Sequence, residues 1–461
     1  MGELAVPARA YYGASTQRAV VNFPVSGLRL PRRMIGALGA IKREAARVNL
    51  ELGLLDQARA EAIASAADEV ARGLFDQEFV VDVFQTGSGT SSNMNANEVI
   101  ANRALELLGA NRGDRSTIHP NDHVNLGQSS NDVFPTAIHL AALAALAEDL
   151  DPALAQLQAA LERQREQLWG VIKTGRTHLQ DATPIRLGQE FLGYRGQVER
   201  TRQRLGAARA QLLEVALGGT AVGTGIGSHQ EFAGRVLERL SAIYDPNLRE
   251  SDNHFQAQSN LDAVVFTSGV VRAAAISIHK IANDIRLLSC GPRAGISELS
   301  LPAVQPGSSI MPGKVNPVIC ESVLMVVAQV IGCDATVAFA GATGSLLELN
   351  VMLPVAAHNL LEAIELLARA SANFAANAVE GLTATDRGPA LLEQGLAICT
   401  GLVPAIGYDA AAAIAHTAFE SNRTVREVAL ERSGLTAEEI DHLLDPERQV
   451  EPTLTGPSQP G

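Results

Sequence analysis

Five long apolar runs limit this chain to an all-α fold with a core bundle of long helices. Each run follows a helical pattern, and strand signals between the runs are few. The predicted long helices cover 136–170, 185–215, 258–290, 318–341 and 350–380. Shorter helical patterns precede and follow them, so smaller, mainly helical domains are expected at both ends of the bundle.

A chain of 461 residues is expected to divide into two or three domains. The N-terminal domain is predicted at 1–128 and the central helical-bundle domain at 129–381. The helices then shorten, which predicts a small C-terminal helical domain at 382–445. The last stretch, 446–461, is rich in proline, glycine and polar residues and is predicted to be a disordered tail.

Charge and cysteine usage exclude several classes of protein. The net charge of −13 argues against nucleic-acid binding, because phosphate backbones require a basic surface. The four cysteines contain no CxxC pair, so a zinc ribbon or an iron–sulfur cluster is not expected, and a reducing cytoplasm is the predicted location. Charge or glycine interrupts the longest apolar runs, and we expect none of them to span a membrane.

Four polar clusters interrupt the helical pattern, at 86–98, 119–132, 174–181 and 307–321. They supply hydroxyls and amides together with His178 and Lys314, and they contain no recognisable cradle for a metal or cofactor. Long helices can bring such loops together within one subunit or between subunits. In an acidic protein, a donor-rich site of this kind suits a small polyanion that undergoes proton transfer.

Three local patterns each allow more than one interpretation. The 86–98 cluster has no lysine after its glycines, so it is not a Walker loop, and its polar residues also suit a helix N-cap. His119 and His123 have the spacing of a metal pair, but Pro120 argues against a regular helix across them. The glycine-rich stretch 218–227 follows a helical pattern, so we interpret it as a turn or lid and not as a dinucleotide site.

The stretch 307–317 has the composition of a shaped loop, with two glycines and two prolines. Its polar side chains can point at one bound molecule, and Lys314 suits a carboxylate or phosphate. They are Ser308, Ser309, Lys314 and Asn316. Ile310 and Met311 are apolar and are expected to anchor the loop.

Proton abstraction beside a carboxylate requires a base and a means of stabilising the aci-carboxylate that forms. Lys314, Asn316 and loop N–H groups can stabilise that charge. The candidates for acid–base work are His178, Ser308 and Glu321. A serine can act as a base only if loop dipoles and a nearby lysine stabilise its alkoxide. Glu321 falls in the first turn of a predicted helix, which favours a carboxylate there whatever its role.

At these clusters the sequence closely resembles the fumarase/aspartase superfamily, and within it the class II fumarases, from Val6-Pro7 to about residue 445. The most specific motif is 307–317, which is similar to the mobile loop of the superfamily. The resemblance implies a homotetramer whose active sites each draw loops from three subunits. It also implies the reversible hydration of fumarate to (S)-malate, a step of the tricarboxylic acid cycle, with no metal or other cofactor.

The resemblance also implies residue roles. Ser308 would take the C3 proton, and His178, charge-coupled to Glu321, would act with a water as the acid for the departing hydroxyl. The carboxylates of the small dicarboxylate substrate would be bound by Ser88, Thr90, Ser129, Ser130, Asn131, Thr177, Ser309, Lys314 and Asn316. A secondary anion site would consist of His119, Asn121 and Asp122.

This sequence departs from the family pattern in places. Some members have an arginine three residues before His119, where this chain has Ser116, so the secondary site is expected to differ. His123 stands where many fumarases carry aspartate and aspartases often carry histidine. Aspartate ammonia-lyase is therefore the nearest alternative function. A non-catalytic scaffold is a second alternative, against which the intact set of Ser308, Lys314, His178 and Glu321 argues. Adenylosuccinate and argininosuccinate lyases match the loop less well.

Overall fold

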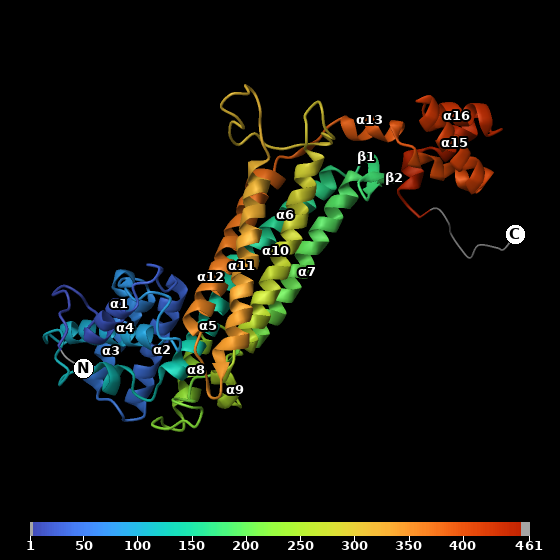
Figure 1. The fold of residues 1–461 in the computed structure, drawn as a ribbon. Helices are drawn as coiled ribbons and strands as arrows, with labels where there is room; N and C mark the ends of the chain where they lie inside the picture. The colour runs from blue at the N-terminus through green and yellow to red at the C-terminus, as the bar shows by residue number, and fades with distance from the viewer. Residues whose placement is uncertain (1–2, 453–461) are drawn as a thin grey trace. The chain divides into compact units, whose positions relative to one another are not determined.

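The structure, a computed structural model, describes residues 3–452 and confirms the predicted all-α class (Figure 1). Helices dominate, and the strands of the described residues form four two-stranded sheets. The chain divides into two compact units. The described residues of the first unit are 3–153, 201–276 and 326–369, and those of the second are 154–200, 277–325 and 370–452. The boundaries predicted near 128, 381 and 445 stay predictions.

The predicted long helices are present, with ends within a few residues of those expected. They are α6 (Asp151–Gln167), α7 (Leu187–Leu212), α10 (Asp262–Leu288), α11 (Val318–Gly344) and α12 (Leu353–Phe374). The first run starts earlier than predicted, as α5 (Ser130–Ala145), and continues through the π-helical turn η3 (Leu146–Leu150) into α6. Polar contacts fix neighbouring long helices. In the first unit, Asp334 of α11 accepts a hydrogen bond from Ser268 of α10 at 2.7 Å.

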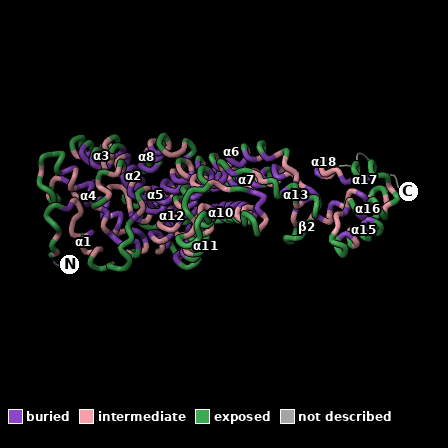
Figure 2. The backbone as a smooth tube through the Cα atoms, turned by 90° about the horizontal axis from the view of Figure 1, so that it is seen from above, coloured by how far each residue is buried: buried purple, intermediate pink, exposed green. Residues whose placement is uncertain are grey.

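The helices of the N-terminal part of the first unit pack around α2 (Arg32–Glu51), whose inward face is apolar. Much of this helix is buried (Figure 2). Leu38, Ile41 and Val48 on this face are fully buried. Gly39 lets α3 (Gln57–Ala71) approach α2 closely, since a Cβ on Gly39 would lie 2.6 Å from the backbone nitrogen of Ala71. The remaining elements of this unit are α1 (Ala14–Asn22), η1 (Asp76–Glu78), α4 (Thr90–Leu107), η2 (Pro120–Val124), β3 (Glu214–Val215), α8 (Phe232–Ser241), β4 (Arg249–Glu250), α9 (His254–Ser259), β6 (Ser345–Leu346) and β7 (Leu349–Asn350).

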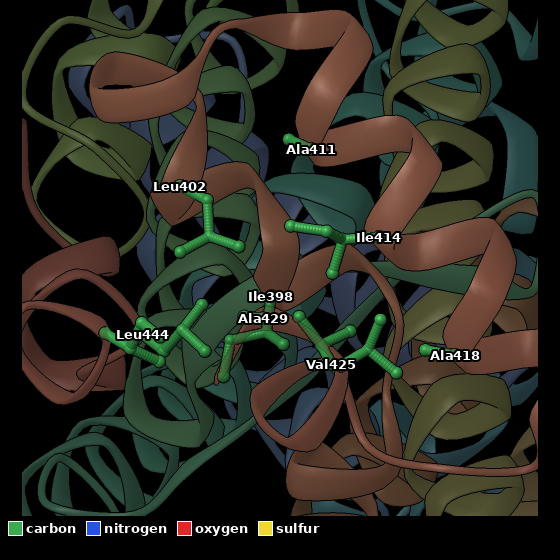
Figure 3. Close-up of a cluster of buried hydrophobic side chains, with 10 residues drawn as sticks. Ile398, Leu402, Ala411, Ile414, Ala418, Val425, Ala429 and Leu444 are labelled. Carbon is green, nitrogen blue, oxygen red and sulfur yellow. The ribbon is translucent and has the colours of Figure 1, made fainter. Parts of the chain in front are cut away.

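The second unit ends in a group of short helices with an apolar core of their own (Figure 3). Ile398, Leu402, Ile414 and Val425 are among the buried side chains that meet there. The elements of this unit outside the long helices are β1 (Ile172–Thr177), β2 (Gln180–Arg186), β5 (Leu299–Ser300), η4 (Ala375–Val379), β8 (Thr383–Ala384), α13 (Arg387–Gln394), η5 (Ala397–Leu402), α14 (Val403–Ile406), α15 (Tyr408–Ser421), α16 (Val425–Arg432), α17 (Ala437–Leu443) and α18 (Pro446–Gln449).

The polar cluster at 174–181 is part of a β-hairpin, which the sequence pattern did not predict. Strands β1 and β2 pair antiparallel, and Thr177 pairs with Gln180 across a two-residue turn. Both turn residues, His178 and Leu179, have positive φ angles, of 55° and 60°. Such turns match the twist of the flanking strands, but they usually contain asparagine or glycine, so this turn carries no sequence signal.

Among the residues that the structure describes, three helical segments are long and apolar enough to cross a membrane by length and composition, so the contrary expectation from sequence is wrong on that test. They are 130–167, α10 and α11. In the apolar windows of α10 and α11 only 44% and 39% of the residues are buried. The exposed side chains include Phe266 and Ile276 on α10 and Met325 and Phe339 on α11. These helices therefore present apolar surface that a single chain leaves uncovered.

The predicted tail at 446–461 begins with the short helix α18, which the Asp445 side chain caps by accepting a hydrogen bond from the Glu447 N–H at 3.0 Å. The structure thus describes residues 446–449 of the predicted tail as helical. Residues 453–461 of that prediction lie outside the described residues.

Candidate active site

Polar side chains at the starts of α4 and α5 meet in the first unit. We call Ser88, Thr90, Ser129, Ser130 and Asn131 the hydroxyl cluster. The Thr90 hydroxyl lies 2.8 Å from the Ser88 hydroxyl and 2.7 Å from the Ser130 hydroxyl. Thr90 is the first residue of α4 and Ser130 the first of α5, so free backbone N–H groups of two helix N-termini accompany these hydroxyls. Such a group of donors can bind a carboxylate without a formal positive charge.

Gly89 makes the close approach of α4 and α5 possible. Its φ of 74° is left-handed, and a Cβ at this position would lie 2.3 Å from a ring carbon of Phe134 on α5. A side chain at residue 89 would therefore push the two helix starts apart. The glycines of 86–98 consequently serve the packing of this site, as well as the turn that enters α4.

The start of α5 is held by a capping box and by the glycine-rich stretch 218–227. Asp132 accepts a hydrogen bond from the Ser129 N–H at 2.9 Å, and its second oxygen accepts from the N–H groups of Gly218 and Thr220. Asn131 donates to the Ala221 carbonyl at 2.8 Å. Asp132 is fully buried, and this burial raises the pKa of its carboxyl group. The glycine-rich stretch is thus a turn that braces the hydroxyl cluster.

A fully buried lysine lies beneath the cluster and was not singled out from sequence. Lys42 of α2 donates to the Asn125 side-chain oxygen at 2.7 Å, and Asn93 and Asn97 of α4 donate to the same oxygen. Asn125 in turn donates to the Gln128 carbonyl, next to Ser129. Desolvation lowers the pKa of Lys42 to about 7, against the opposing effect of Asp132. The sequence signal that could have indicated this burial is the position of Lys42, four residues after Leu38 and therefore on the same apolar face of α2.

The residues predicted to form a secondary anion site lie together in and just before η2. His119 Nδ1 accepts from the N–H groups of Asn121 and Asp122 and lies 3.3 Å from an oxygen of Asp122. The backbone N–H of His119 donates a hydrogen bond to the imidazole Nδ1 of His123 at 2.9 Å. The two imidazoles are thus used in local contacts of the turn. Burial, followed by the charge of Arg59, lowers the pKa of His123.

Ser116 cannot replace the missing arginine as a cation. Its hydroxyl donates to Asp114 at 2.6 Å, and Thr117 donates to the other oxygen of the same carboxylate at 2.6 Å. These hydrogen bonds lower the pKa of Asp114, so that a negative charge stands close to the predicted site. An anion at His119, Asn121 and Asp122 would therefore meet less favourable electrostatics than one bound beside an arginine.

In the second unit, residues 307–317 form a closed loop, which we call the catalytic loop. The Gly307 N–H donates to the Lys314 carbonyl at 2.7 Å, and the Asn316 side chain donates to the Gly307 carbonyl at 2.8 Å. Any Cβ on Gly307 would lie 2.7 Å from the same Lys314 oxygen. The expected apolar anchor is wrong for the single chain, because Ile310 and Met311 are exposed. Backbone hydrogen bonds shape the loop instead.

The Ser308 hydroxyl lies at a focus of backbone donors within the catalytic loop. Its Oγ accepts from the Met311 N–H at 3.0 Å and from the Ile310 N–H at 3.3 Å. Hydrogen bonds to a charged form favour that form, so two N–H groups aimed at Oγ stabilise an alkoxide. Ser309 and Lys314 are exposed on the same loop. This arrangement supplies the donors that a serine base requires.

The strands β1 and β2 and their turn form a second segment that carries predicted catalytic residues, and we call it the histidine hairpin (172–186). Thr177 and His178 are exposed at its tip. Left-handed backbone in a non-glycine residue costs free energy and is often retained where a side chain must point in a set direction. Within the described residues of one chain, no hydrogen bond or ion pair links His178 to Glu321, which is exposed in the first turn of α11. Their coupling stays a prediction.

Comparison with known proteins gives matches over almost the whole chain. A family model described as Lyase matches residues 2–332, and one described as Fumarase C C-terminus matches 398–450. A class II fumarate hydratase of Halobacterium salinarum is 54% identical over 97% of this chain and 95% of its own length. One from Methylorubrum extorquens is 49% identical over 98% and 96%.

Solved structures agree with the sequence matches. The crystal structure of class II fumarase from Schistosoma mansoni superposes with a TM-score of 0.93 at 39% identity, over 96% of each chain. A fumarate lyase:delta crystallin from Brucella melitensis, bound to cobalt, also gives a TM-score of 0.93, at 48% identity over 97% of each chain. The similarity therefore includes both units and the C-terminal helices.

Proposed function

We propose, because this chain belongs to the fumarase/aspartase superfamily of lyases, that it is a fumarate hydratase, which catalyses the reversible hydration of fumarate to (S)-malate. The observation that carries the proposal is full-length similarity to relatives named class II fumarate hydratase, at about half of all positions. The names of these relatives and of a structural neighbour do not favour the aspartate ammonia-lyase alternative. In the cell this reaction would belong to the tricarboxylic acid cycle.

The hydroxyl cluster is proposed to bind one substrate carboxylate. Three linked hydroxyls and two helix N-termini present donors in a partly buried setting, where hydrogen bonds to an anion gain strength. Lys314 and Asn316 of the catalytic loop and Thr177 of the histidine hairpin are proposed to bind the remaining carboxylate oxygens. The charge of Lys314 then also stabilises the aci-carboxylate that forms when the C3 proton leaves.

Ser308 is proposed to be the base that takes the C3 proton of malate. The two N–H groups that donate to its Oγ support the role, because they stabilise the alkoxide. His178, with a water, is proposed to protonate the departing C2 hydroxyl, and Glu321 to stabilise the protonated imidazole. If so, Glu321→Gln shifts the limb of the pH–rate profile that reports His178. An unchanged profile would remove Glu321 from this role.

The site is proposed to be completed by other copies of the chain in a homotetramer. Ser308, Lys314, Thr177 and His178 lie on exposed segments of a single chain, where water would compete for every contact. The apolar surface of α10 and α11 supports assembly, because monomers rarely expose so much apolar area. Small dicarboxylates are the proposed ligands. The cytoplasm is the proposed location, and four free thiols agree with it.

The first experiment follows the ultraviolet absorbance of fumarate as it appears from (S)-malate and, separately, from L-aspartate. Purified enzyme is used without added metal. Absorbance from malate alone supports the hydratase. Absorbance from aspartate alone overturns it in favour of ammonia-lyase, and His123 becomes the first residue to exchange. No absorbance from either substrate contradicts both enzymatic functions.

A second experiment tests the shared site. Ser308→Ala and His178→Asn are each expected to be nearly inactive as pure oligomers. Co-expressed with two different tags and purified as mixed oligomers, they are expected to regain hydratase activity, because some sites then combine an intact Ser308 with an intact His178 from different copies. Mixed oligomers as inactive as the pure variants would show that one chain supplies both groups to the same site.

A further inference from the structure

A buried network of charges lies at the base of the histidine hairpin. Glu298 is 1% exposed and pairs with two cations: Arg176 Nη2 is 2.8 Å from its Oε1, and Lys173 Nζ is 3.0 Å from its Oε2. Lys173, also 1% exposed, reaches Glu190 Oε1 on α7 at 2.9 Å. Lys173 and Glu298 are therefore buried, Arg176 and Glu190 lie partly buried beside them, and none of the four was singled out from the sequence.

The network joins the two catalytic segments of the second unit. Lys173 and Arg176 belong to β1, and Arg176 directly precedes Thr177 and His178. Glu298 directly precedes β5, from which the chain continues into the catalytic loop with Ser308. The side chain of one buried glutamate thus connects the strand that ends in His178 to the segment that leads to Ser308.

The two sides of this connection differ in how firmly the backbone is held. The Glu298 N–H donates to the Leu288 carbonyl at 2.8 Å, and its carbonyl accepts from the Thr385 N–H at 3.0 Å. The strand that follows pairs with β8. The backbone of Glu298 is therefore held in place by hydrogen bonds to Leu288 and Thr385 and by the pairing of the strand that follows. Among the described residues, the turn His178-Leu179 has no comparable backbone hydrogen bonds outside the hairpin, although α13 packs on β1 and η5 and α18 pack on β2. Arg176 and Lys173 add charged contacts that tie β1 to the fixed backbone at Glu298.

Stability alone is a poor explanation for this network. Burying charges costs free energy that pairing only partly returns, and apolar replacements are often no worse. The pairing is also incomplete, since Arg176 Nη1, Glu190 Oε2 and Glu298 Oε2 are buried with no hydrogen-bond partner among the described residues. The contact of Lys173 with Glu298 Oε2 is thus an ion pair without hydrogen-bond geometry, and the directed hydrogen bond to Glu298 comes from Arg176. What charged pairs provide and apolar contacts do not is a directional constraint on the groups that they join.

We propose that Glu298 is a positioning residue, which sets the orientation of the histidine hairpin, and with it His178, on its own chain through Arg176 and Lys173, whichever copy supplies the Ser308 of the same site. The inference rests on the proposed function, because it gives His178 and Ser308 their chemical roles. Glu298 itself touches no reacting atom. Its removal should therefore misplace catalytic groups while leaving the carboxylate-binding hydroxyls of the first unit intact.

The test compares Glu298→Gln with Asp334→Asn in the full-length oligomer. Both changes neutralise a buried carboxylate, but Asp334 pairs with Ser268 and Arg272 on α10 and contacts neither catalytic segment. Glu298→Gln is expected to lower kcat between about 10-fold and 10²-fold with little change in KM, because small misplacements of reacting groups are costly. Asp334→Asn is expected to keep the wild-type kcat even if its melting temperature falls equally. Equal kcat values in both variants would overturn the proposal.

Hydrogen exchange separates this proposal from the proposed reaction. Amides of 172–186 are expected to exchange about 10-fold faster in Glu298→Gln than in the wild type, and not in Asp334→Asn. If the exchange rates of the hairpin amides are unchanged in Glu298→Gln, Glu298 does not position the hairpin, even if the enzyme is a fumarate hydratase. If Glu298→Gln fails to assemble, Arg176→Gln, which removes only the hairpin side, replaces it and is judged by the same two measurements.

Discussion

The hydroxyl cluster and the two catalytic segments differ in how far they are buried and in which contacts hold them in shape. The cluster is partly buried, its hydroxyls are bonded to one another, and the start of α5 is braced by Asp132 and the 218–227 stretch. The catalytic loop and histidine hairpin are exposed at their tips, and their shape comes from their own backbone hydrogen bonds. The hydroxyls proposed to bind one carboxylate are thus held in place within one chain, whereas the proposed acid–base residues Ser308 and His178 lie on segments that a single chain leaves exposed.

This difference predicts where substitutions act. Changes in the cluster should alter substrate affinity or stability, because its atoms are packed and mutually bonded. Changes at the tips should alter turnover with little effect on folding, since few contacts within the chain are lost. The predictions below test this separation, beginning with the largest effect.

Ser308→Ala should lower kcat by about 10²-fold or more, the loss expected for a positioned acid–base group. Its melting temperature should stay near that of the wild type, because Ser308 lies on an exposed loop. The assay is the absorbance of fumarate formed from malate. Ser300→Ala, an exposed serine on β5, is the control and should keep the wild-type kcat. A kcat for Ser308→Ala close to the control value would remove Ser308 as the base.

Gly87→Ala and Gly307→Ala apply the same change to the two regions. A Cβ on Gly87 would lie 1.8 Å from the carbonyl oxygen of Val351, so packed backbone must move, and a loss of about 1–3 kcal/mol or more of stability is expected. A Cβ on Gly307 would disturb only the exposed catalytic loop. Calorimetry should therefore show a lower melting temperature for Gly87→Ala, and kinetics a lower kcat for Gly307→Ala. Similar melting temperatures for the two variants would contradict the comparison.

Thr90→Val removes the hydroxyl that links Ser88 to Ser130 and keeps the shape of the side chain. It should raise KM for fumarate about 10-fold, since a hydrogen bond to a charged group is worth about 1.5–3 kcal/mol, while kcat changes less. Thr343→Val is the matched control, because that hydroxyl donates only within α11 to the Phe339 carbonyl and, weakly, to Met352. If kcat falls and KM does not rise, the hydroxyl cluster acts in catalysis and not in substrate binding, which would contradict the comparison.

The sequence predicted the long helices well because their apolar periodicity extends over many turns, and the ends of α7 and α10 lie within a few residues of the prediction. The polar clusters were recognised by composition, and the motif at 307–317 indicated the family. The histidine hairpin was missed because its turn, His178-Leu179, contains neither glycine nor asparagine. The network of Lys173, Arg176 and Glu298 was missed because residues far apart in sequence form it.

Lys42 was missed for another reason, because charged side chains are expected at the surface and this one is fully buried. Burial lowers the pKa of Lys42 to about 7 from 10.5 in the unfolded chain. Between these pH values the unfolded chain holds a proton that the folded protein has released. The contribution of Lys42 to the free energy of unfolding therefore rises with pH across that range, by at most about 1.4 kcal/mol per pH unit. Below pH 7 the folded protein holds a buried charge, and the full destabilising effect of this burial is present.

Lys42→Met removes this titration and tests whether the support of the hydroxyl cluster depends on pH. The difference in unfolding free energy, wild type minus variant, should be smallest at pH 6 and should grow up to pH 9. Urea unfolding at several pH values measures it. Lys280→Met, which removes a half-exposed lysine paired with Asp284 on α10, should give a difference that hardly varies with pH. If the difference in unfolding free energy for Lys42→Met does not vary with pH, Lys42 keeps its ordinary pKa in the folded protein. Asp132 and the asparagines around Asn125 would then offset the effect of burial, and the hydroxyl cluster would be supported by an ammonium group that stays charged across this pH range.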